Sequence, residues 1–163
     1  MVTPAFAAAW FLPFATPIAL WIAWSDMRAM RIPNQAVLLL VLVFLFVGPF
    51  VLSFEDWAWR WTHLLVVLVA GFILNVIGQT GAGDAKYAAA MAPMIAQEDL
   101  ISVMILVAGT LPAALVTHRL FGAVPAIRRL TPDWASWGKK DDFPFGLALS
   151  GILLLYLVLS VKY

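Results

Sequence analysis

Two carboxylates stand apart in this sequence because each sits alone beside a break between apolar segments. Asp26 lies in residues 25–34 (SDMRAMRIPN), and Asp84 lies in residues 81–86 (GAGDAK). Isolated carboxylates at the edge of a membrane segment are costly and are usually functional. The remaining acidic residues fall in adjacent pairs or in the long loop before the last apolar segment, where solvation accounts for them: Glu55, Asp56, Glu98, Asp99, Asp133, Asp141 and Asp142.

The chemistry open to Asp26 and Asp84 depends on whether they meet. Two carboxylates within a few ångströms share a proton and titrate as a pair. The ionised member then activates a water molecule while the protonated member polarises a carbonyl group. On one face of a membrane, Asp26 and Asp84 would therefore form a general acid–base pair for peptide hydrolysis without a covalent intermediate.

Other interpretations of the same carboxylates stay open at this point. Asp84 alone would serve as a cap for the following helix, and Asp26 alone would form a headgroup-level ion pair with Arg28 or Arg31. A small proton-coupled transporter or channel subunit also places carboxylates in broken helices. A non-catalytic scaffold would need both aspartates only as helix caps.

The residues around Asp84 suit a peptide substrate. Gly81 and Gly83 permit backbone angles with positive φ and the close approach of another chain, as an extended peptide beside Asp84 requires. Lys86 either stabilises an ionised partner or anchors the chain at the headgroups. Gly81, Gly83 and Lys86 are therefore the candidate substrate-binding residues. Asn34 is a candidate to orient Asp26 by a hydrogen bond.

Several other chemistries are disfavoured by the sequence. It contains no cysteine, which removes disulfides, thiolate metal sites and a cysteine nucleophile. There is no His-Glu-x-x-His motif, and His63 and His118 are predicted on opposite faces of the membrane. We expect no metal, no organic cofactor and no nucleic-acid partner; the net charge of +1 by itself says nothing about nucleic acid.

The elements that position these residues are predicted to be membrane-spanning helices. Of 163 residues, 64% are hydrophobic and 12% are charged, whereas a soluble domain is nearer half apolar and a quarter charged. A span needs about 20 residues. The fold class is therefore all-α, polytopic in the lipid bilayer, with about six transmembrane helices. The fourth, short and rich in Ala and Met, is expected to be tilted, shallow or half-buried; the six are 4–24, 36–54, 62–79, 85–96, 100–120 and 143–161.

The basic residues predict the orientation of these helices. With six spans, the loops 25–35, 80–86 and 118–142 share one side and carry eight of the ten Lys and Arg residues, leaving Arg60 and Lys162 on the other. Cytoplasmic loops attract Lys and Arg, so both termini are expected outside and Asp26 and Asp84 at the cytoplasmic face. Loop 118–142 would be a surface strap or a flap over that face. Three interfacial anchors are predicted in the outer loop 55–61: Trp57, Trp59 and Trp61.

Three stretches, in this order on a six-helix pattern, resemble the type IV prepilin peptidase family, polytopic aspartic proteases of the bacterial cytoplasmic (inner) membrane. They are residues 26–34, ending in Arg-Ile-Pro-Asn, residues 81–86, a Gly-x-Gly-Asp-x-Lys signature, and residues 143–146 (FPFG), which open the last helix. Presenilin-type intramembrane proteases, which share Gly-x-Gly-Asp, are similar more distantly. The resemblance implies that Asp26 and Asp84 are the catalytic aspartates. The implied substrate is a prepilin or pseudopilin with a basic leader, cut on the cytoplasmic side ahead of a hydrophobic helix that stays in the bilayer.

One departure from the family pattern concerns its large cytoplasmic insertion with paired cysteines. The loop 25–35 is too short for that insertion, and the chain has no cysteine. The chain is thus similar to the short form associated with Flp or Tad-type pili, or to an archaeal preflagellin peptidase. We expect a single integral-membrane peptidase domain over residues 1–163, with no soluble methyltransferase-type insertion and no N-methylation by this chain. Leu147 also stands where the family often has proline.

Overall fold

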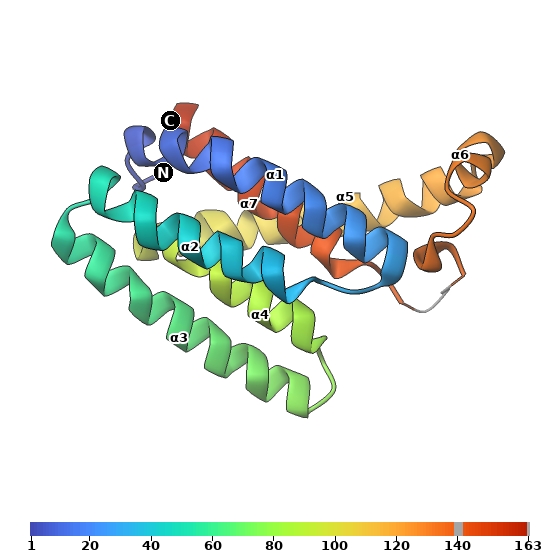
Figure 1. The fold of residues 1–163 in the computed structure, drawn as a ribbon, viewed down its shortest axis with the longest axis horizontal. Helices are drawn as coiled ribbons and strands as arrows, with labels where there is room; N and C mark the ends of the chain where they lie inside the picture. The colour runs from blue at the N-terminus through green and yellow to red at the C-terminus, as the bar shows by residue number, and fades with distance from the viewer. Residues whose placement is uncertain (139–141, 163) are drawn as a thin grey trace.

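Five long apolar helices dominate the computed structural model, which describes residues 1–138 and 142–162 (Figure 1). Their length and composition suit a membrane crossing: α1 (Ala5–Ala29), α2 (Asn34–Val51), α3 (Phe54–Val76), α5 (Leu100–Ala123) and α7 (Phe145–Lys162). The shorter elements are α4 (Ala82–Met91), η1 (Ala92–Met94), η2 (Gln97–Asp99), α6 (Pro125–Leu130) and η3 (Ala135–Trp137). The predicted all-α polytopic fold is confirmed.

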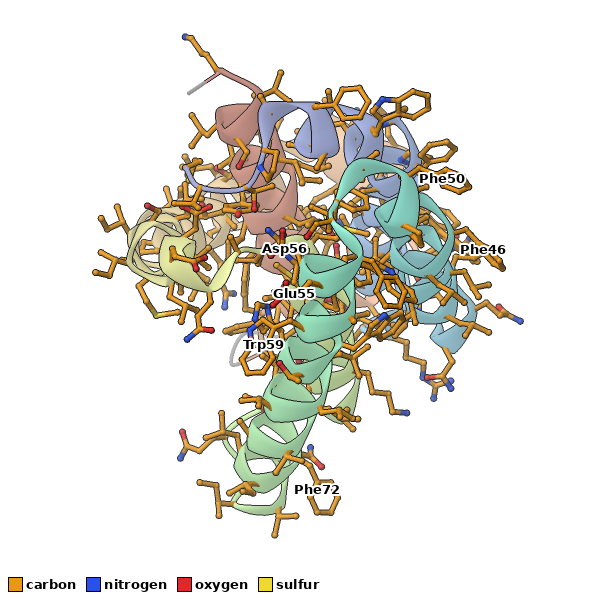
Figure 2. All side chains as sticks on the ribbon, turned by 90° about the vertical axis from the view of Figure 1, so that its left-hand side faces the viewer. Phe46, Phe50, Glu55, Asp56, Trp59 and Phe72 are labelled. Carbon is orange, nitrogen blue, oxygen red and sulfur yellow. The ribbon has the colours of Figure 1, made fainter. Side chains whose placement is uncertain are left out.

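The centre of the bundle is the contact between α1 and α7, which run side by side (Figure 1). The buried side of α1 is rich in alanine, and small side chains let helices in a membrane approach closely. α2 packs on α1, where the rings of Phe11 and Phe44 stack with centroids 5.9 Å apart. α3 and α5 lie on the outside with few buried side chains. Figure 2 shows Phe72 of α3, and Phe46 and Phe50 of α2, on the outer surface that a bilayer would cover.

The predicted fourth span differs most from the structure. Residues 85–96 form the ten-residue α4 followed by η1, so this segment does not count among the five long helices. It still joins the two ends of the bundle. Asp84 lies at the end where α1 finishes, whereas the Ala96 N–H donates to Thr3 Oγ1 (3.2 Å), just before α1 begins. Neighbouring helices bury almost the whole segment, which explains how so short a helix is stable there.

Two helix boundaries also differ from the prediction. α1 continues through Asp26 to Ala29, so Asp26 lies in the last turn of a helix and not in a loop. α3 begins at Phe54, so the predicted outer loop with its three tryptophans is helical. Ser53 caps this helix: the Asp56 N–H donates to Ser53 Oγ (3.1 Å), and the Ser53 hydroxyl donates to Asp56 Oδ2 (2.7 Å).

The chain near its N-terminus is fastened by Asp99, which the sequence analysis wrongly treated as solvated. Asp99 is only 2% exposed. Its carboxylate accepts hydrogen bonds from the N–H groups of Val2 and Thr3 and from the Tyr156 hydroxyl (2.7 Å). This network joins the starts of α1 and α5 to the last turns of α7. A buried charge that receives several hydrogen bonds is tolerated.

The predicted loop 118–142 is largely structured. α5 extends to Ala123, and α6 and η3 follow it. The ring of Trp137 stacks on that of His118 with centroids 4.8 Å apart, which ties η3 back to α5. Three residues of this loop in the sequence analysis, Lys139, Lys140 and Asp141, lie outside the described residues.

Candidate active site

Asp26 is held by the first turn of α7. Its side chain is 6% exposed, and its Oδ2 accepts a hydrogen bond of 2.7 Å from the backbone N–H of Gly146. The first N–H groups of a helix have no partner within the helix, and the helix dipole favours a negative charge beside them. The stretch 143–146 therefore meets the stretch that contains Asp26, although 120 residues separate the bonded pair.

Gly146 is closely packed against Asp26 and Ile32. A Cβ atom at this position would lie 3.0 Å from Asp26 Oδ2 and 3.2 Å from Ile32 Cδ1, so both neighbours would have to shift. The short hydrogen bond to Asp26 thus favours glycine. From the sequence, this glycine was noted only as part of the third motif, without a role.

Asp84 lies in the first turn of α4, half-buried, at the same end of the bundle. The short α4 is not among the five spanning helices. Burial and, next, the charge of Asp26 raise the pKa of the Asp84 carboxyl from 3.8 to about 6, and the Gly81 N–H opposes that rise. The packing is consistent with this effect, because Ile32 contacts both Gly83, beside Asp84, and Gly146, which binds Asp26. Two isolated carboxylates from α1 and α4 share one site.

Gly81 and Gly83 both stand at close approaches. A Cβ atom on Gly81 would lie 2.6 Å from Asp84 Oδ2, and one on Gly83 would lie 3.3 Å from Ile32 Cβ. Ile32 therefore packs against the start of α4 and, through Gly146, against the start of α7. Through Ile32, the turn between α1 and α2 thus packs α1, which carries Asp26, against α4, which carries Asp84.

Two non-catalytic interpretations can be compared with the structure: Asp84 as a helix cap and Asp26 as a member of an ion pair. Asp84 interacts with the Gly81 N–H at the start of α4, as expected for a helix cap, in addition to its proximity to Asp26. The ion pair predicted for Asp26 is absent among the described residues, where Gly146 is its partner. Arg28 instead lies over the Trp24 ring, 5.1 Å from its centroid.

Lys86 and Asn34 bind each other across the break. The Lys86 side chain is exposed, and its Nζ donates to Asn34 Oδ1 at 3.4 Å. Asn34 is the first residue of α2 and in this structure pairs with Lys86, not with Asp26. Lys86 lies two residues after Asp84 at the exposed rim of the site.

The sequence model of the type IV leader peptidase family matches residues 14–126, which is 113 of the 163 residues and includes both aspartates. The chain belongs to this family. It is a membrane aspartic peptidase that cleaves the leader peptides of prepilins. No curated protein and no solved structure was found to match the chain.

The peptidase has one further polar contact that the sequence analysis missed. Ser150, two helical positions past the first turn of α7, donates from Oγ to the Ala19 carbonyl (2.9 Å). Its hydroxyl proton is thereby used, so the Tyr87 hydroxyl donates to Ser150 Oγ (3.1 Å). These two hydrogen bonds link α4, α7 and α1 about one helical turn from Asp84 and from Gly146. The only sequence signal was a serine and a tyrosine within apolar segments.

Proposed function

We propose that Asp26 and Asp84 are the catalytic pair with which this peptidase cuts the leader junction of its substrate. One observation carries the proposal: Ile32 packs against both Gly83, beside Asp84, and Gly146, which binds Asp26, so isolated carboxylates from α1 and α4 lie at the same end of the bundle. Such a pair shares one proton.

The shared proton defines the reaction. The ionised aspartate takes a proton from water as that water attacks the scissile carbonyl, and the protonated aspartate donates a hydrogen bond to the carbonyl oxygen. The tetrahedral intermediate then collapses, the C–N bond breaks, and a proton passes to the leaving amine. Gly146 keeps the Asp26 carboxylate in place throughout.

Gly81, Gly83 and Lys86 are proposed to form the edge that faces the substrate. Gly81 is exposed with an extended backbone (φ −70°, ψ 143°), which suits pairing with an extended peptide. Gly83 contributes through its packing on Ile32, and Lys86 through its exposed ammonium group. A large side chain at Gly81 would fill the space beside Asp84.

We further propose that the catalytic end faces the cytoplasm, with both termini outside, as the distribution of Lys and Arg predicts. Residues 1–163 would then be one integral-membrane peptidase domain of the short form, without a methyltransferase-type insertion, in a bacterial cytoplasmic membrane. The substrate would be a Flp-type prepilin or pseudopilin with a basic leader and a hydrophobic helix.

The test is leader removal in membranes that contain this chain and a Flp-type prepilin, read as a mobility shift on a gel. Wild type is compared with Asp26→Asn and Asp84→Asn at equal expression. Asp133→Asn, an exposed aspartate in the segment between α6 and η3, is the matched control. We expect cleavage by wild type and by the control, and none by either single variant. Cleavage that survives in both single variants would falsify the two-aspartate mechanism.

A further inference from the structure

An apolar groove of about 560 Å³ opens between α3 and α5. Its walls are exposed side chains of these two outer helices, such as Val66 and Met104. Its floor is made by α4, η1 and α7, whose lining side chains are largely buried. Trp59, labelled in Figure 2, lies at the end of the groove that is far from the aspartates. Because α3 and α5 are both candidate membrane spans, the groove lies at the depth of the hydrocarbon.

The groove leads towards the candidate active site. Ala88 on its floor lies four residues after Asp84, so both are on the same side of α4. Leu149, also in the lining, lies three residues after Gly146, which binds Asp26. The floor therefore ends one helical turn from each catalytic carboxylate. An occupant of the groove would have one end at the aspartates.

The floor is lined by small side chains. Ala88 lies in α4, Ala92 is the first residue of η1, and Ala96 follows η1 with an extended backbone; all three line the groove. Small residues allow a second helix to approach closely within a membrane. From Asp84 to Met91 the floor follows seven residues of α-helix (91 − 84), which extend about 10 Å at about 1.5 Å per residue. η1 and residues 95–96 continue the floor to the end of the bundle where the Ala96 N–H bonds Thr3.

We propose that this groove receives the hydrophobic helix of the prepilin, parallel to α4, with the leader junction at Asp84. The inference rests on the proposed catalytic pair, because the direction of the substrate follows from where it is cut. The hydrophobic helix of the prepilin and its leader junction are consecutive parts of one polypeptide. The position of that helix in the groove therefore determines which peptide bond of the substrate reaches the aspartates.

The experiment exploits the absence of cysteine, since any introduced cysteine is the only one in the chain. In the Asp84→Asn background, which leaves the prepilin uncut, Val66→Cys and Met104→Cys carry a benzophenone photo-crosslinker on the groove walls. The controls are Leu38→Cys and Phe46→Cys on the outside of α2. Exposures are matched, 66% for Val66 against 57% for Leu38 and 58% for Met104 against 65% for Phe46. The positions are also matched in depth, counted from the helix end that is far from the aspartates. Val66 lies 12 residues and Leu38 13 residues from that end, and Met104 lies 4 residues and Phe46 5 residues from it.

Irradiation in membranes with a Flp-type prepilin should give prepilin adducts from both groove positions and at least tenfold fewer from both α2 positions. Peptide mapping should place the Met104 adducts farther from the leader junction than the Val66 adducts, because Met104 is nearer the far end of the groove. Adducts mainly with lipid, adducts with a second copy of this chain, or equal yields from groove and α2 positions would each overturn the inference.

Cleavage separates this inference from the catalytic proposal. The same cysteine variants with Asp84 intact and no probe attached are assayed for leader removal. If they cleave the prepilin and the groove still gives no prepilin adducts, the docking site is wrong while the catalytic pair stands. If wild type does not cleave, the catalytic proposal itself fails.

Discussion

At the scale of single residues, the position of Asp26 depends on a glycine in another helix. The hydrogen bond from the Gly146 N–H is short because no side chain separates the two residues. A displacement of about 1 Å in a catalytic group can lower a rate by about 10²-fold. Catalysis should therefore be more sensitive to Gly146 than to any other glycine of α7.

We predict that Gly146→Ala lowers kcat/KM for prepilin cleavage by about 10- to 100-fold, because the new methyl group would displace Asp26 and Ile32. Gly151→Ala is the matched control. A Cβ atom there would meet Thr110 Cγ2 of α5 at 3.1 Å, which is similar crowding in the same helix but against a side chain that is no aspartate. Initial rates of both variants at equal expression test this. Equal losses would mean that crowding of α7, and not Asp26, limits activity.

Asp84 should make the stability of the protein depend on pH. Its pKa is raised from 3.8 to about 6 on folding, so the folded state binds the proton more tightly than the unfolded state. Stability therefore falls as pH rises through this window. Asp84→Asn removes the buried charge and should raise Tm above about pH 6, with the advantage lost by about pH 4. Thermal unfolding in detergent at several pH values, with Asp133→Asn beside it, measures this. An advantage that does not change with pH would contradict the prediction.

At the scale of helices, the polar link from Tyr87 through Ser150 to the Ala19 carbonyl holds α4, α7 and α1 together. Removing the Ser150 hydroxyl leaves the buried Tyr87 hydroxyl without this partner, which costs about 1–3 kcal/mol. The Ala19 carbonyl lies within α1 and keeps its bond inside the helix. The positions of the two aspartate-bearing helices should depend on this serine.

Ser150→Ala is expected to lower the free energy of unfolding by about 1–3 kcal/mol and to reduce cleavage as well. Ser160→Ala is the control, because Ser160 is a buried serine of the same helix whose Oγ donates to the Tyr156 carbonyl one turn earlier. Denaturation of both variants, together with Tyr87→Phe and the double variant, gives the coupling energy. Additive effects of Tyr87→Phe and Ser150→Ala would rule out a shared link.

The sequence was informative about some elements and not about others, for physical reasons. Apolar runs long enough for a membrane predicted five helices correctly. The isolation of Asp26 and Asp84 from other acids marked them as candidates, and the distribution of Lys and Arg predicted that they lie at one face; their catalytic role stays a prediction. The length of α4 was missed because the apolar run continues past Pro93, where the regular helix gives way to η1. The burial of Asp99 was unpredictable because its partners Val2 and Thr3 are almost 100 residues away and supply only backbone groups.

At the scale of the whole molecule, the two ends of the bundle differ in chemistry. One end has the aspartates with the Lys86–Asn34 pair beside them, and the other has the Asp99 network around Thr3. The chain from Asp84 to Ala96 joins them. The spanning helix α3 also runs between these two ends. Glu55 lies in its first turn and Gln79 lies just after its last residue, so these two exposed residues are on opposite sides of the membrane.

Labelling should reveal this orientation. A single cysteine at Gln79 should react with a membrane-impermeant maleimide only in inverted vesicles, and one at Glu55 only in intact spheroplasts, because we propose that the end with the aspartates faces the cytoplasm. Detergent should make both cysteines reactive, which controls for accessibility. The reverse pattern would place the aspartates outside and would contradict the orientation drawn from Lys and Arg.

The burial of α4 and η1 has a consequence for bilayers of different thickness. A lipid-facing helix tilts or distorts the bilayer when its apolar length does not match the membrane, and α3 and α5, which have few buried side chains, are subject to that adjustment. Apart from the exposed Lys86 and the half-buried Ala88, residues 85–96 are buried by protein, so the bilayer has little direct contact with them. The site should therefore keep its geometry in thin and thick membranes alike, while the width of the opening between α3 and α5 varies with the lipid.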